Sequence, residues 1–407
     1  MAGDVRGGDM SGVRTALVVG GGLAGPVTAL ALRKAGVDAT VYEAYATTAD
    51  GIGGQLTVAP NGLDALATIG AAEAVKAVGL PMRRTVMANG RGRVLAEFEA
   101  LPDLEPSRTM WRSELYRALH DHAAAEGVRT EHGKRLVGVD ESPTGVTARF
   151  ADGTSATADV LVGADGINST VRTLIDPAAA GPSHVPLLNF GAAADISVPA
   201  APDATYFVFG RRAFLGYWIQ PDGRTSWFGN LPHQARMSSA EARAVPARQW
   251  LDRLREVYAD DVPGRELLAH TDPARLCAFG SMEILPRVTT WHRGRVVLVG
   301  DAAHAPSSSS GQGASLAAES AVQLARCLRD LPDVPSAFAA YERLRRPRVE
   351  KVAARAAKTN NTKGFGPVAS AVMGLVMPLA MKTFLTPEKM LGLEQRHHIE
   401  WSDTVAA

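Results

Sequence analysis

The stretch Thr15-Ala-Leu-Val-Val-Gly-Gly-Gly-Leu-Ala-Gly25 decides the fold of this chain. Residues 15–19 form a short apolar run that ends at glycine, which predicts a buried parallel strand. Gly20, Gly22 and Gly25 then allow a tight turn, a close approach of phosphate to the backbone and tight packing of helix on strand. A helix expected over Gly25–Ala35 and a strand over Asp38–Glu43 complete a strand–helix–strand unit.

Glu43 closes the second of these strands and indicates what the unit binds. A carboxylate at this place accepts hydrogen bonds from a ribose 2′-hydroxyl group and disfavours a 2′-phosphate. The positive end of the helix dipole favours the phosphates of the same ligand. The unit therefore predicts a dinucleotide site, although by itself it does not separate FAD from NAD.

A second glycine-bearing segment, Gly163-Ala-Asp-Gly-Ile-Asn-Ser-Thr-Val-Arg172, lies in the middle of the chain. It follows a strand expected over Ala158–Val162 and leads into a helix. As an ordinary strand–turn–helix junction, the segment would have Ser169 as the helix N-cap. Taken alone, it leaves that reading and a role in a cofactor site equally open.

The third segment comes near the end of the chain and favours the cofactor site. Asp301, in Gly300-Asp-Ala-Ala-His304, follows a strand expected over Arg295–Val299, where its carboxylate can accept a hydrogen bond from a ribityl hydroxyl. Gly311-Gln-Gly313 then precedes a helix beginning near Ala314, whose positive end can face the edge of a flavin ring. One extended cofactor that touches the start, middle and end of the chain explains the order of all three segments.

From about Pro182 the sequence becomes aromatic and β-favouring, as in Phe214-Leu-Gly-Tyr-Trp-Ile, and predicts an antiparallel sheet. The expected fold class is α/β: a discontinuous Rossmann-like FAD-binding domain with an inserted antiparallel β-sheet substrate domain and C-terminal helices. The expected boundaries are 1–14 for a disordered lead-in, 15–180 and 286–360 for the FAD-binding domain, 181–285 for the substrate domain and 361–407 for a C-terminal helical segment. Other elements expected are helices over Ser113–Glu126, Pro246–Tyr258, Ala314–Leu328 and Pro335–Arg355, and a hairpin of Val146–Phe150 with Ala158–Val162 through Asp152-Gly153.

Composition excludes several classes of protein. A formal net charge of +1 on 407 residues gives no electrostatic bias toward nucleic acid or an anionic membrane. Cys277 and Cys327 have no metal-ligand spacing, so we expect no metal, a reducing compartment and a cytoplasmic location. Val368–Leu385 is apolar but is interrupted by Gly374, Pro378 and Lys382, and we expect it to pack on the protein instead of spanning a membrane. The oligomeric state stays open.

The three segments together resemble those of the FAD-dependent aromatic-hydroxylase-type monooxygenases, the group similar to para-hydroxybenzoate hydroxylase. The resemblance runs from about Thr15 to Arg348. Trp111-Arg-Ser-Glu-Leu-Tyr-Arg-Ala-Leu119 resembles the family's Arg-x-x-Leu-x-x-x-Leu helix, and Lys134-Arg-Leu-Val137 resembles the strand that meets the adenine. One departure is the run Ser307–Ser310, which fills positions near the flavin where the family usually has a proline. The cofactor-binding residues implied are Gly20, Gly22, Leu23, Ala24, Gly25, Glu43, Ala44, Arg112, Leu136, Asp165, Asp301, Gly311, Gly313 and Ala314.

The resemblance also implies a reaction. Non-covalent FAD, reduced by transient NADPH or NADH, reacts with O2 to a C4a-hydroperoxide that hydroxylates a small aromatic or hydrophobic compound. Because the cofactor carries this chemistry, no catalytic side chain is assigned, and the flavin-edge candidates are Ser308, Gly311 and Gly313. The resemblance implies that Asp165 serves both FAD and NAD(P)H. The substrate candidates are Tyr217, Trp218 and Phe228, of which alternation along a strand turns only about half toward one face.

Four alternatives remain open at this point. An olefin epoxidase would use the same chemistry, and a flavin-dependent halogenase is partly suggested by Tyr217-Trp-Ile-Gln-Pro221. The serine run also allows a flavin-binding protein without catalysis. A NAD-dependent dehydrogenase would leave the third segment unexplained. No general base is identified, since we expect His304 to orient the backbone and His233 to lie at the surface.

Overall fold

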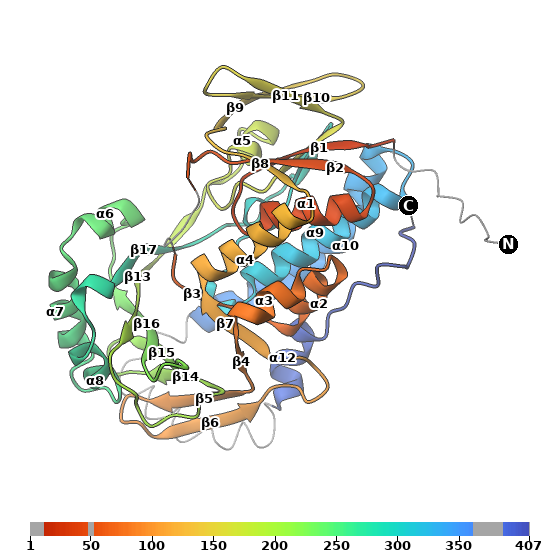
Figure 1. The fold of residues 1–407 in the computed structure, drawn as a ribbon. Coiled ribbons are helices and arrows are strands. Elements are labelled where there is room, and N and C mark those ends of the chain that lie inside the picture. The colour runs from red at the N-terminus through yellow and green to blue at the C-terminus, as the bar shows by residue number, and fades with distance from the viewer. Residues whose placement is uncertain (1–11, 48–52, 361–385, 407) are drawn as a thin grey trace.

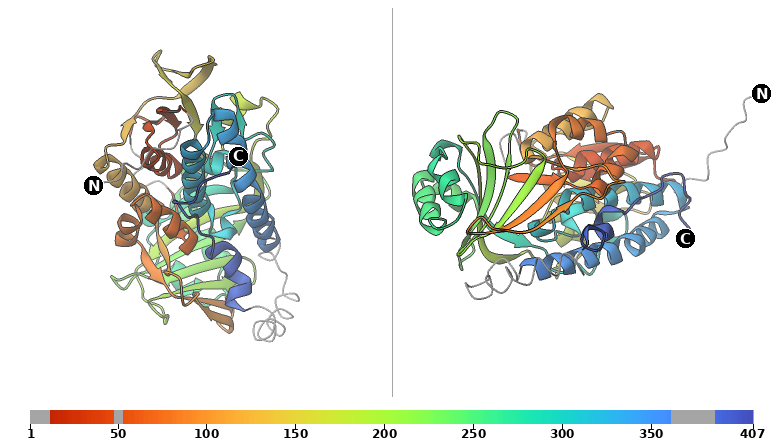
Figure 2. Two further views of the ribbon diagram at one scale, coloured as in Figure 1. Left: turned by 90° about the vertical axis from the view of Figure 1, so that its right-hand side faces the viewer. Right: turned by 90° about the horizontal axis from the view of Figure 1, so that it is seen from below.

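The structure is a computed structural model that describes residues 12–47, 53–360 and 386–406. Two large sheets, two three-stranded sheets and the surrounding helices build it (Figures 1 and 2). Most of the expected lead-in and all of the apolar stretch Val368–Leu385 lie outside the described residues. Within the described ranges, no helix has the length and apolar character needed to cross a bilayer, and no cluster of potential metal ligands is present.

The first large sheet is mostly parallel. Its strands are β1 (Thr15–Val19), β2 (Asp38–Tyr42), β8 (Arg129–Glu131), β12 (Val160–Gly163), β18 (His292–Arg293) and β19 (Val296–Leu298). Their order is β18-β19-β12-β1-β2-β8, and β1 pairs in parallel with β2 and β12. α1 (Ala24–Lys34) connects β1 to β2, so the expected strand–helix–strand unit is confirmed.

Helices cover one face of this sheet and a small sheet covers the other (Figure 1). On that side lie α1, α4 (Arg112–Ala125), α9 (Gly313–Asp330) and α10 (Val334–Asn360). α2 (Pro60–Thr68) and α3 (Ala72–Val78) pack beyond them, α2 on α9 and α3 on α4. The opposite face carries α5 (Thr170–Ile175) and the antiparallel strands β9 (Leu136–Glu141), β10 (Val146–Phe150) and β11 (Ser155–Ala158). A further small sheet of β3 (Gln55–Val58), β4 (Leu80–Met82) and β7 (Ser107–Trp111) leads toward the second large sheet.

The second large sheet has seven strands in the order β17-β13-β16-β15-β14-β5-β6. Its strands are β5 (Arg84–Asn89), β6 (Val94–Glu99), β13 (Ser183–Ala194), β14 (Ala204–Phe209), β15 (Phe214–Ile219), β16 (Thr225–Pro232) and β17 (Cys277–Ile284). Three helices, α6 (Ser239–Ala244), α7 (Ala247–Val257) and α8 (Gly264–Ala269), cover its outer face (Figure 2). Apolar side chains of the sheet pack there against Trp250, Leu251 and Leu254 of α7.

Three local details differ from expectation. β5 and β6 belong to the segment that we grouped with the FAD-binding part, yet β5 pairs in parallel with β14 of the second large sheet. The strand expected over Ala158–Val162 is divided at Asp159, which belongs to neither ladder: its N–H donates to Thr15 Oγ1, and its carboxylate accepts from the N–H groups of Arg14 and Thr15. In the described part of 361–407, α12 (Pro387–Gln395) is helical and 396–406 is not.

Candidate functional site

Three neighbouring strands of the parallel sheet bring the three glycine segments together. β1, β12 and β19 lie side by side and run in the same direction, so their carboxyl ends share one edge of the sheet. A side-chain carbon added at Gly20, after β1, would lie 2.6 Å from the carbonyl oxygen of Ala164, after β12. One added at Gly300, after β19, would lie 3.0 Å from Ala24 Cβ. Segments far apart in the sequence thus form one site.

The glycines of the first turn differ in how closely other atoms surround them. Gly20 has a φ angle of +107°, in the region that favours glycine, and an added carbon at Gly25 would lie 2.0 Å from the Gly20 carbonyl oxygen. At Gly22, in contrast, an added carbon would meet no described atom within 4 Å. Gly20 and Gly25 are therefore required by local packing, whereas Gly22 borders open space at the N-terminus of α1, where a phosphate can approach.

Glu43 lies at the end of β2 beside this turn, as expected. Its carboxylate accepts hydrogen bonds from the backbone N–H groups of Gly21, at 2.5 Å, and Tyr45, at 2.8 Å. Ala44 is half-buried next to it. The side chain of Leu136, on β9, is buried in the core, so only its backbone is available to a ligand.

One face of α4 points at the same turn. Arg112, Tyr116 and His120 are four residues apart and so lie on one side of the helix. His120 Nε2 donates a hydrogen bond to the Gly21 carbonyl oxygen at 2.6 Å, and burial lowers the pKa of its imidazole. His120 is not among the cofactor-binding residues predicted from the sequence, although its spacing from Arg112 places both on one side of the expected helix.

The middle segment is a capped helix start that also reaches the third segment. Asp165 accepts hydrogen bonds from Ser169 Oγ at 2.5 Å and from the Val171 N–H at 3.0 Å, so its carboxylate is already engaged at the start of α5. Ser169 is the N-cap, as the ordinary reading of this junction requires. Buried Arg172, which sequence reasoning overlooked, donates to the carbonyl oxygens of Ile167 at 2.8 Å and Ala302 at 3.1 Å. Arg172 therefore ties the middle segment to the third.

Asp301 is the open carboxylate of the site. It follows β19 in a short turn and is exposed to solvent, although the surrounding protein raises the pKa of its carboxyl group and the charge of Arg112 lowers that pKa by less. An added carbon at Gly313 would lie 4.0 Å from its Oδ1. Asp301 thus lies in a recess next to the N-terminus of α9, with its oxygens free to accept hydrogen bonds from a ligand.

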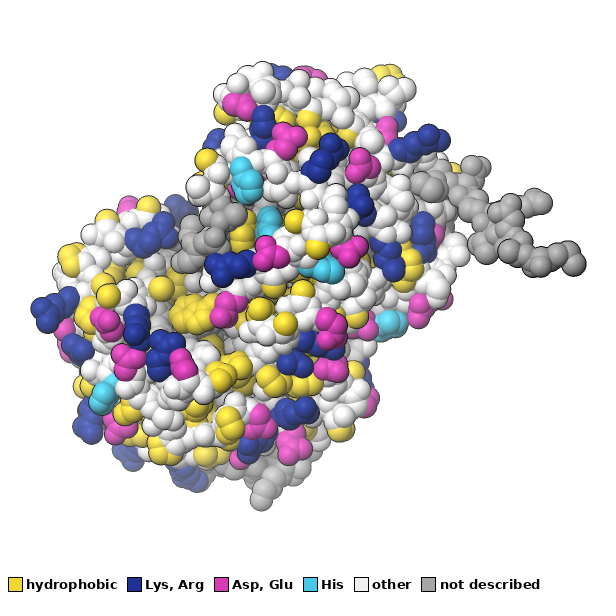
Figure 3. Space-filling view, in the orientation of Figure 1, with side chains coloured by type: hydrophobic (Ala, Val, Ile, Leu, Met, Phe, Trp, Pro, Cys, Tyr) yellow, Lys and Arg dark blue, Asp and Glu magenta, His cyan; other side chains and the backbone are white. Residues whose placement is uncertain are grey.

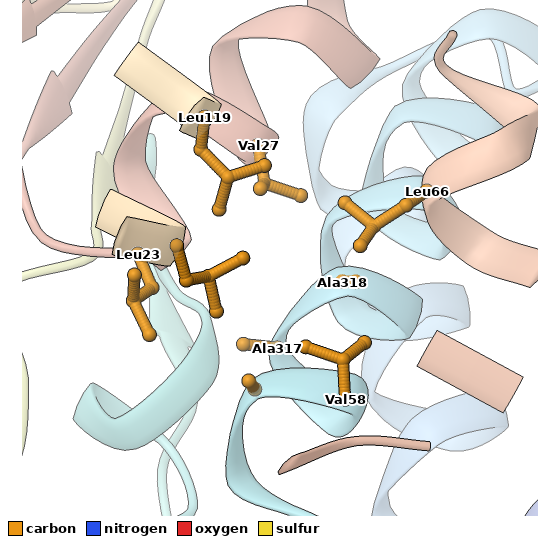
Figure 4. A pocket seen from close by; sticks show the side chains of 9 residues that line it. Leu23, Val27, Val58, Leu66, Leu119, Ala317 and Ala318 are labelled. Atoms are coloured by element: carbon orange, nitrogen blue, oxygen red, sulfur yellow. The ribbon is translucent and has the colours of Figure 1, made fainter. Parts of the chain in front are cut away.

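A small apolar cavity lies between α1, α4 and α9 (Figure 4). Its volume is about 10 Å³, which is room for a single water molecule and no cofactor. Leu23 and Ala314, from the first and third segments, both line it. The side chains of these two predicted residues are therefore partly buried against the core, although neither is fully enclosed.

The serine run forms a short turn before α9. Ser308 is exposed and Ser307 is buried, with its hydroxyl 3.4 Å from Met282 Sδ of β17. Gly311 has a φ angle of +60° and open space beside it. His304 is buried, its Nε2 lies 2.9 Å from Ser320 Oγ, and burial lowers its pKa to about 3. A neutral, enclosed imidazole of this kind is no general base for a substrate.

The substrate candidates separate onto two faces of the seven-stranded sheet. Tyr217 stacks on Tyr206 in the core that faces α7 and α8, so it does not line the inner face. Trp218 and Phe228 lie on that inner face, because neighbouring residues of a strand point to opposite sides. The Phe228 ring covers Gly216, where an added carbon would lie 2.3 Å from it.

The inner face turns toward residues 53–55, which lie between it and Arg112. An added carbon at Gly191 of β13 would lie 3.4 Å from Gln55 Oε1, and one at Gly54 would lie 2.9 Å from the Phe279 ring. Gly53 lies against the Arg112 side chain in the same way. Figure 3 shows apolar side chains gathered in the hollow between the lobe of α6–α8 and the helical part of the molecule.

Comparison with known proteins identifies the arrangement. A family model described as "FAD binding domain" matches residues 14–356. The FAD-dependent urate hydroxylase of Klebsiella pneumoniae is 31% identical over 317 residues, which cover 76% of this chain and 80% of that protein. The 3-amino-4-hydroxybenzoate 2-monooxygenase of Streptomyces platensis is 32% identical over 338 residues, covering 76% and 78%. The structure of Klebsiella pneumoniae HpxO with FAD and uric acid superimposes with a TM-score of 0.83 at 25% identity, covering 95% of this chain and 97% of that one.

Proposed function

We propose that this chain, which belongs to the family of FAD-dependent monooxygenases, hydroxylates a small aromatic or hydrophobic compound with NAD(P)H as the reductant. The observation that carries the proposal is the convergence of three glycine segments on an edge where Gly22, Asp301 and Gly311 border open space. FAD, when bound, supplies the electron transfer and the activation of O2. Everything else falls to the residues of this chain.

The residues present fit an extended dinucleotide. The turn at Gly22 and the N-terminus of α1 offer backbone N–H groups and a positive dipole end to a pyrophosphate. Glu43 holds that turn through Gly21 and lies where a ribose hydroxyl can donate to it. Asp301 would accept a hydrogen bond from a ribityl chain, and the first N–H groups of α9, from Gly313 on, would stabilise negative charge at the edge of the ring.

The substrate side of the proposal rests on the inner face of the seven-stranded sheet. Phe228 is half-buried there, 6.4 Å between ring centroids from both Phe207 and Trp218. Amide side chains accompany these rings: Asn230 donates to Asn189 Oδ1 at 2.6 Å. Trp218 and Asn230 are buried behind this surface, which the half-buried side chains of Phe207, Phe228 and Asn189 form. Flat apolar rings beside a neutral hydrogen-bonding group favour a planar, aromatic compound that carries a polar substituent.

The test is consumption of NADPH and NADH by the FAD-loaded protein in air, alone and with a panel of phenols, aromatic acids, uric acid and polycyclic aromatics. We expect at least one compound to accelerate consumption and to gain one oxygen atom, which 18O2 and mass spectrometry would detect. A yellow protein with a flat response over the panel would contradict hydroxylation of an aromatic compound. An epoxide as the product would move the assignment to the olefin epoxidases.

Replacing Phe228 by alanine is expected to raise the KM for the accepted substrate about tenfold, because ~1.4 kcal/mol of apolar contact corresponds to a factor of ten. FAD affinity should stay unchanged, since Phe228 lies on the sheet and not in the glycine segments. Tyr217→Phe is the matched control, because Tyr217 neighbours Trp218 in the same strand but faces the outer core. Equal effects of both variants on KM would contradict a substrate site on the inner face.

A further inference from the structure

A network of buried polar side chains lies behind the start of α9. Asn61, at the start of α2, is 1% exposed, and its Nδ2 donates to Gln312 Oε1 at 2.9 Å and to Glu319 Oε1 at 2.6 Å. Gln312 stands between Gly311 and Gly313, in the turn that opens α9. Asn61 therefore connects that turn directly to a charged group in the core.

Glu319 is held from the other side by two arginines of α10. Its Oε2 lies 2.8 Å from Arg345 Nη1, and its Oε1 lies 2.7 Å from Arg348 Nη2. Burial raises the pKa of Glu319, but the charges of Arg345 and Arg348 outweigh it and lower the pKa to about 2. His397 is 3.7 Å away, and burial lowers its pKa to about 4. At neutral pH Glu319 is therefore a fixed anionic acceptor.

This acceptor sets the orientation of the Asn61 amide. Both acceptors near Nδ2 are oxygens, so a flipped amide would place the Asn61 carbonyl oxygen against the Glu319 carboxylate and against Gln312 Oε1. In the observed orientation, both donors of the NH2 group are used. The orientation of the Gln312 side chain follows in turn, because its oxygen must face Asn61.

The turn around Gln312 has few other constraints on its ligand side. Gly311 is exposed, with a φ angle of +60° and no described atom within 4 Å of an added carbon. On the inner side, Ser315 Oγ accepts a hydrogen bond from the Ala59 N–H at 3.1 Å, which again joins α9 to the start of α2. Within the turn, the Gln312 N–H donates to Ser310 Oγ at 3.1 Å, and the side chains of Gln312 and Ser315 tie the turn to the start of α2.

We propose that Asn61 is a positioning residue for the flavin: Glu319, held by Arg345 and Arg348, fixes the Asn61 amide, and Asn61 fixes Gln312 and the turn that presents the first N–H groups of α9 to the ring. The proposal rests on the proposed function for the place of the flavin. It predicts that loss of the Asn61 amide disturbs the bound flavin without any change in a group that touches it.

The experiment compares Asn61→Ala with the wild type in two measurements that need no substrate. The FAD dissociation constant should rise about tenfold, as the loss of hydrogen bonds worth ~1.4 kcal/mol implies, and the visible absorption bands of the bound flavin should shift. With a substrate in hand, more NADPH should be lost to hydrogen peroxide. Glu350→Gln is the control, because Glu350 also pairs with arginines of this region, Arg287 and Arg346, but lies half-exposed on α10 away from α9.

The outcomes separate a positioning role from a purely structural one. Unchanged FAD affinity and an unchanged flavin spectrum in Asn61→Ala, with only a lower unfolding midpoint of the apoprotein, would overturn the proposal. If Asn61→Ala does not fold, Gln312→Ala removes the receiving side chain instead and should change the flavin spectrum in the same direction; a wild-type spectrum there would also overturn it. Failure of the wild-type protein to bind FAD would contradict the proposed function instead.

Discussion

A Gly25→Ala protein is expected to be isolated colourless, with an affinity for FAD reduced at least about a hundredfold, or ~2.7 kcal/mol. The added carbon would lie 2.0 Å from the Gly20 carbonyl oxygen, and Cβ atoms do not approach other atoms within 3.0 Å. Gly20 has no room to move aside. Its φ angle is +107°, and a carbon added to it would lie 2.6 Å from the carbonyl oxygen of Ala164. α1 must therefore shift away from β1, and its N-terminus leaves the place where it faces the phosphates.

Two further glycines serve as controls for this result. Gly22→Ala meets no described atom, so the protein should fold as the wild type, but the methyl group occupies space where phosphate approaches and should also weaken FAD binding. Gly181→Ala likewise meets nothing and lies outside all three segments, so both folding and FAD binding should be unchanged. The measurements are the ratio of flavin to protein absorbance and titration of the apoprotein with FAD. A yellow Gly25→Ala protein of wild-type affinity would refute the assignment of the first turn.

The elements around the glycine segments could be predicted from sequence because their signals are local. β1 begins and ends at the residues expected, because its short apolar run is followed directly by Gly20, which marks the turn. The placement of β5 beside β14 has no such signal. Thr85 and Thr205 are paired although they lie far apart in the sequence, and no residue pattern in either strand indicates the other strand as its neighbour. Long-range pairing is decided by the packing of the whole sheet, which a single sequence does not display.

The candidate site divides in the same way. Glu43 and Asp301 were predicted because a carboxylate after a strand has a readable chemistry, and both lie at the edge where the three strands end. The sequence does not say which of Tyr217 and Trp218 faces the substrate side. Both faces of β15 are apolar, so the alternation of side chains does not identify the inner one. Arg172 was missed because it acts by reaching the carbonyl oxygen of Ala302 far along the chain, and sequence spacing carries no trace of such a contact.

Arg345→Met is expected to lower the free energy of unfolding by about 3–5 kcal/mol, the cost of leaving a buried charge without its partner. Arg345 and Glu319 are 2% and 1% exposed, and their closest atoms are 2.8 Å apart. The Arg345 side chain also donates to Ser320 Oγ at 3.3 Å, so its removal leaves a second buried group with fewer partners. Arg348 still contacts Glu319, which places the expected loss at the lower end of this range. Chemical denaturation of the apoprotein at neutral pH measures it.

The dependence of this loss on pH distinguishes the charge from simple repacking. Because the folded-state pKa of Glu319 is lowered from 4.5 to about 2, the ionised carboxylate stabilises the wild type above the unfolded-state pKa, and that contribution is lost as the pH falls through the folded-state value. In Arg345→Met the carboxyl group titrates closer to its unfolded-state pKa, so the stability difference between wild type and variant should shrink below about pH 4. In the double variant Glu319→Gln/Arg345→Met no carboxylate titrates at this place, although Arg348 loses its ionic partner, so its stability should lose this pH dependence. Arg287→Met, which removes an exposed arginine paired with Glu350, should unfold as the wild type does. A loss for Arg345→Met that is independent of pH would show that the cavity left by the side chain, and not the buried carboxylate, sets its size.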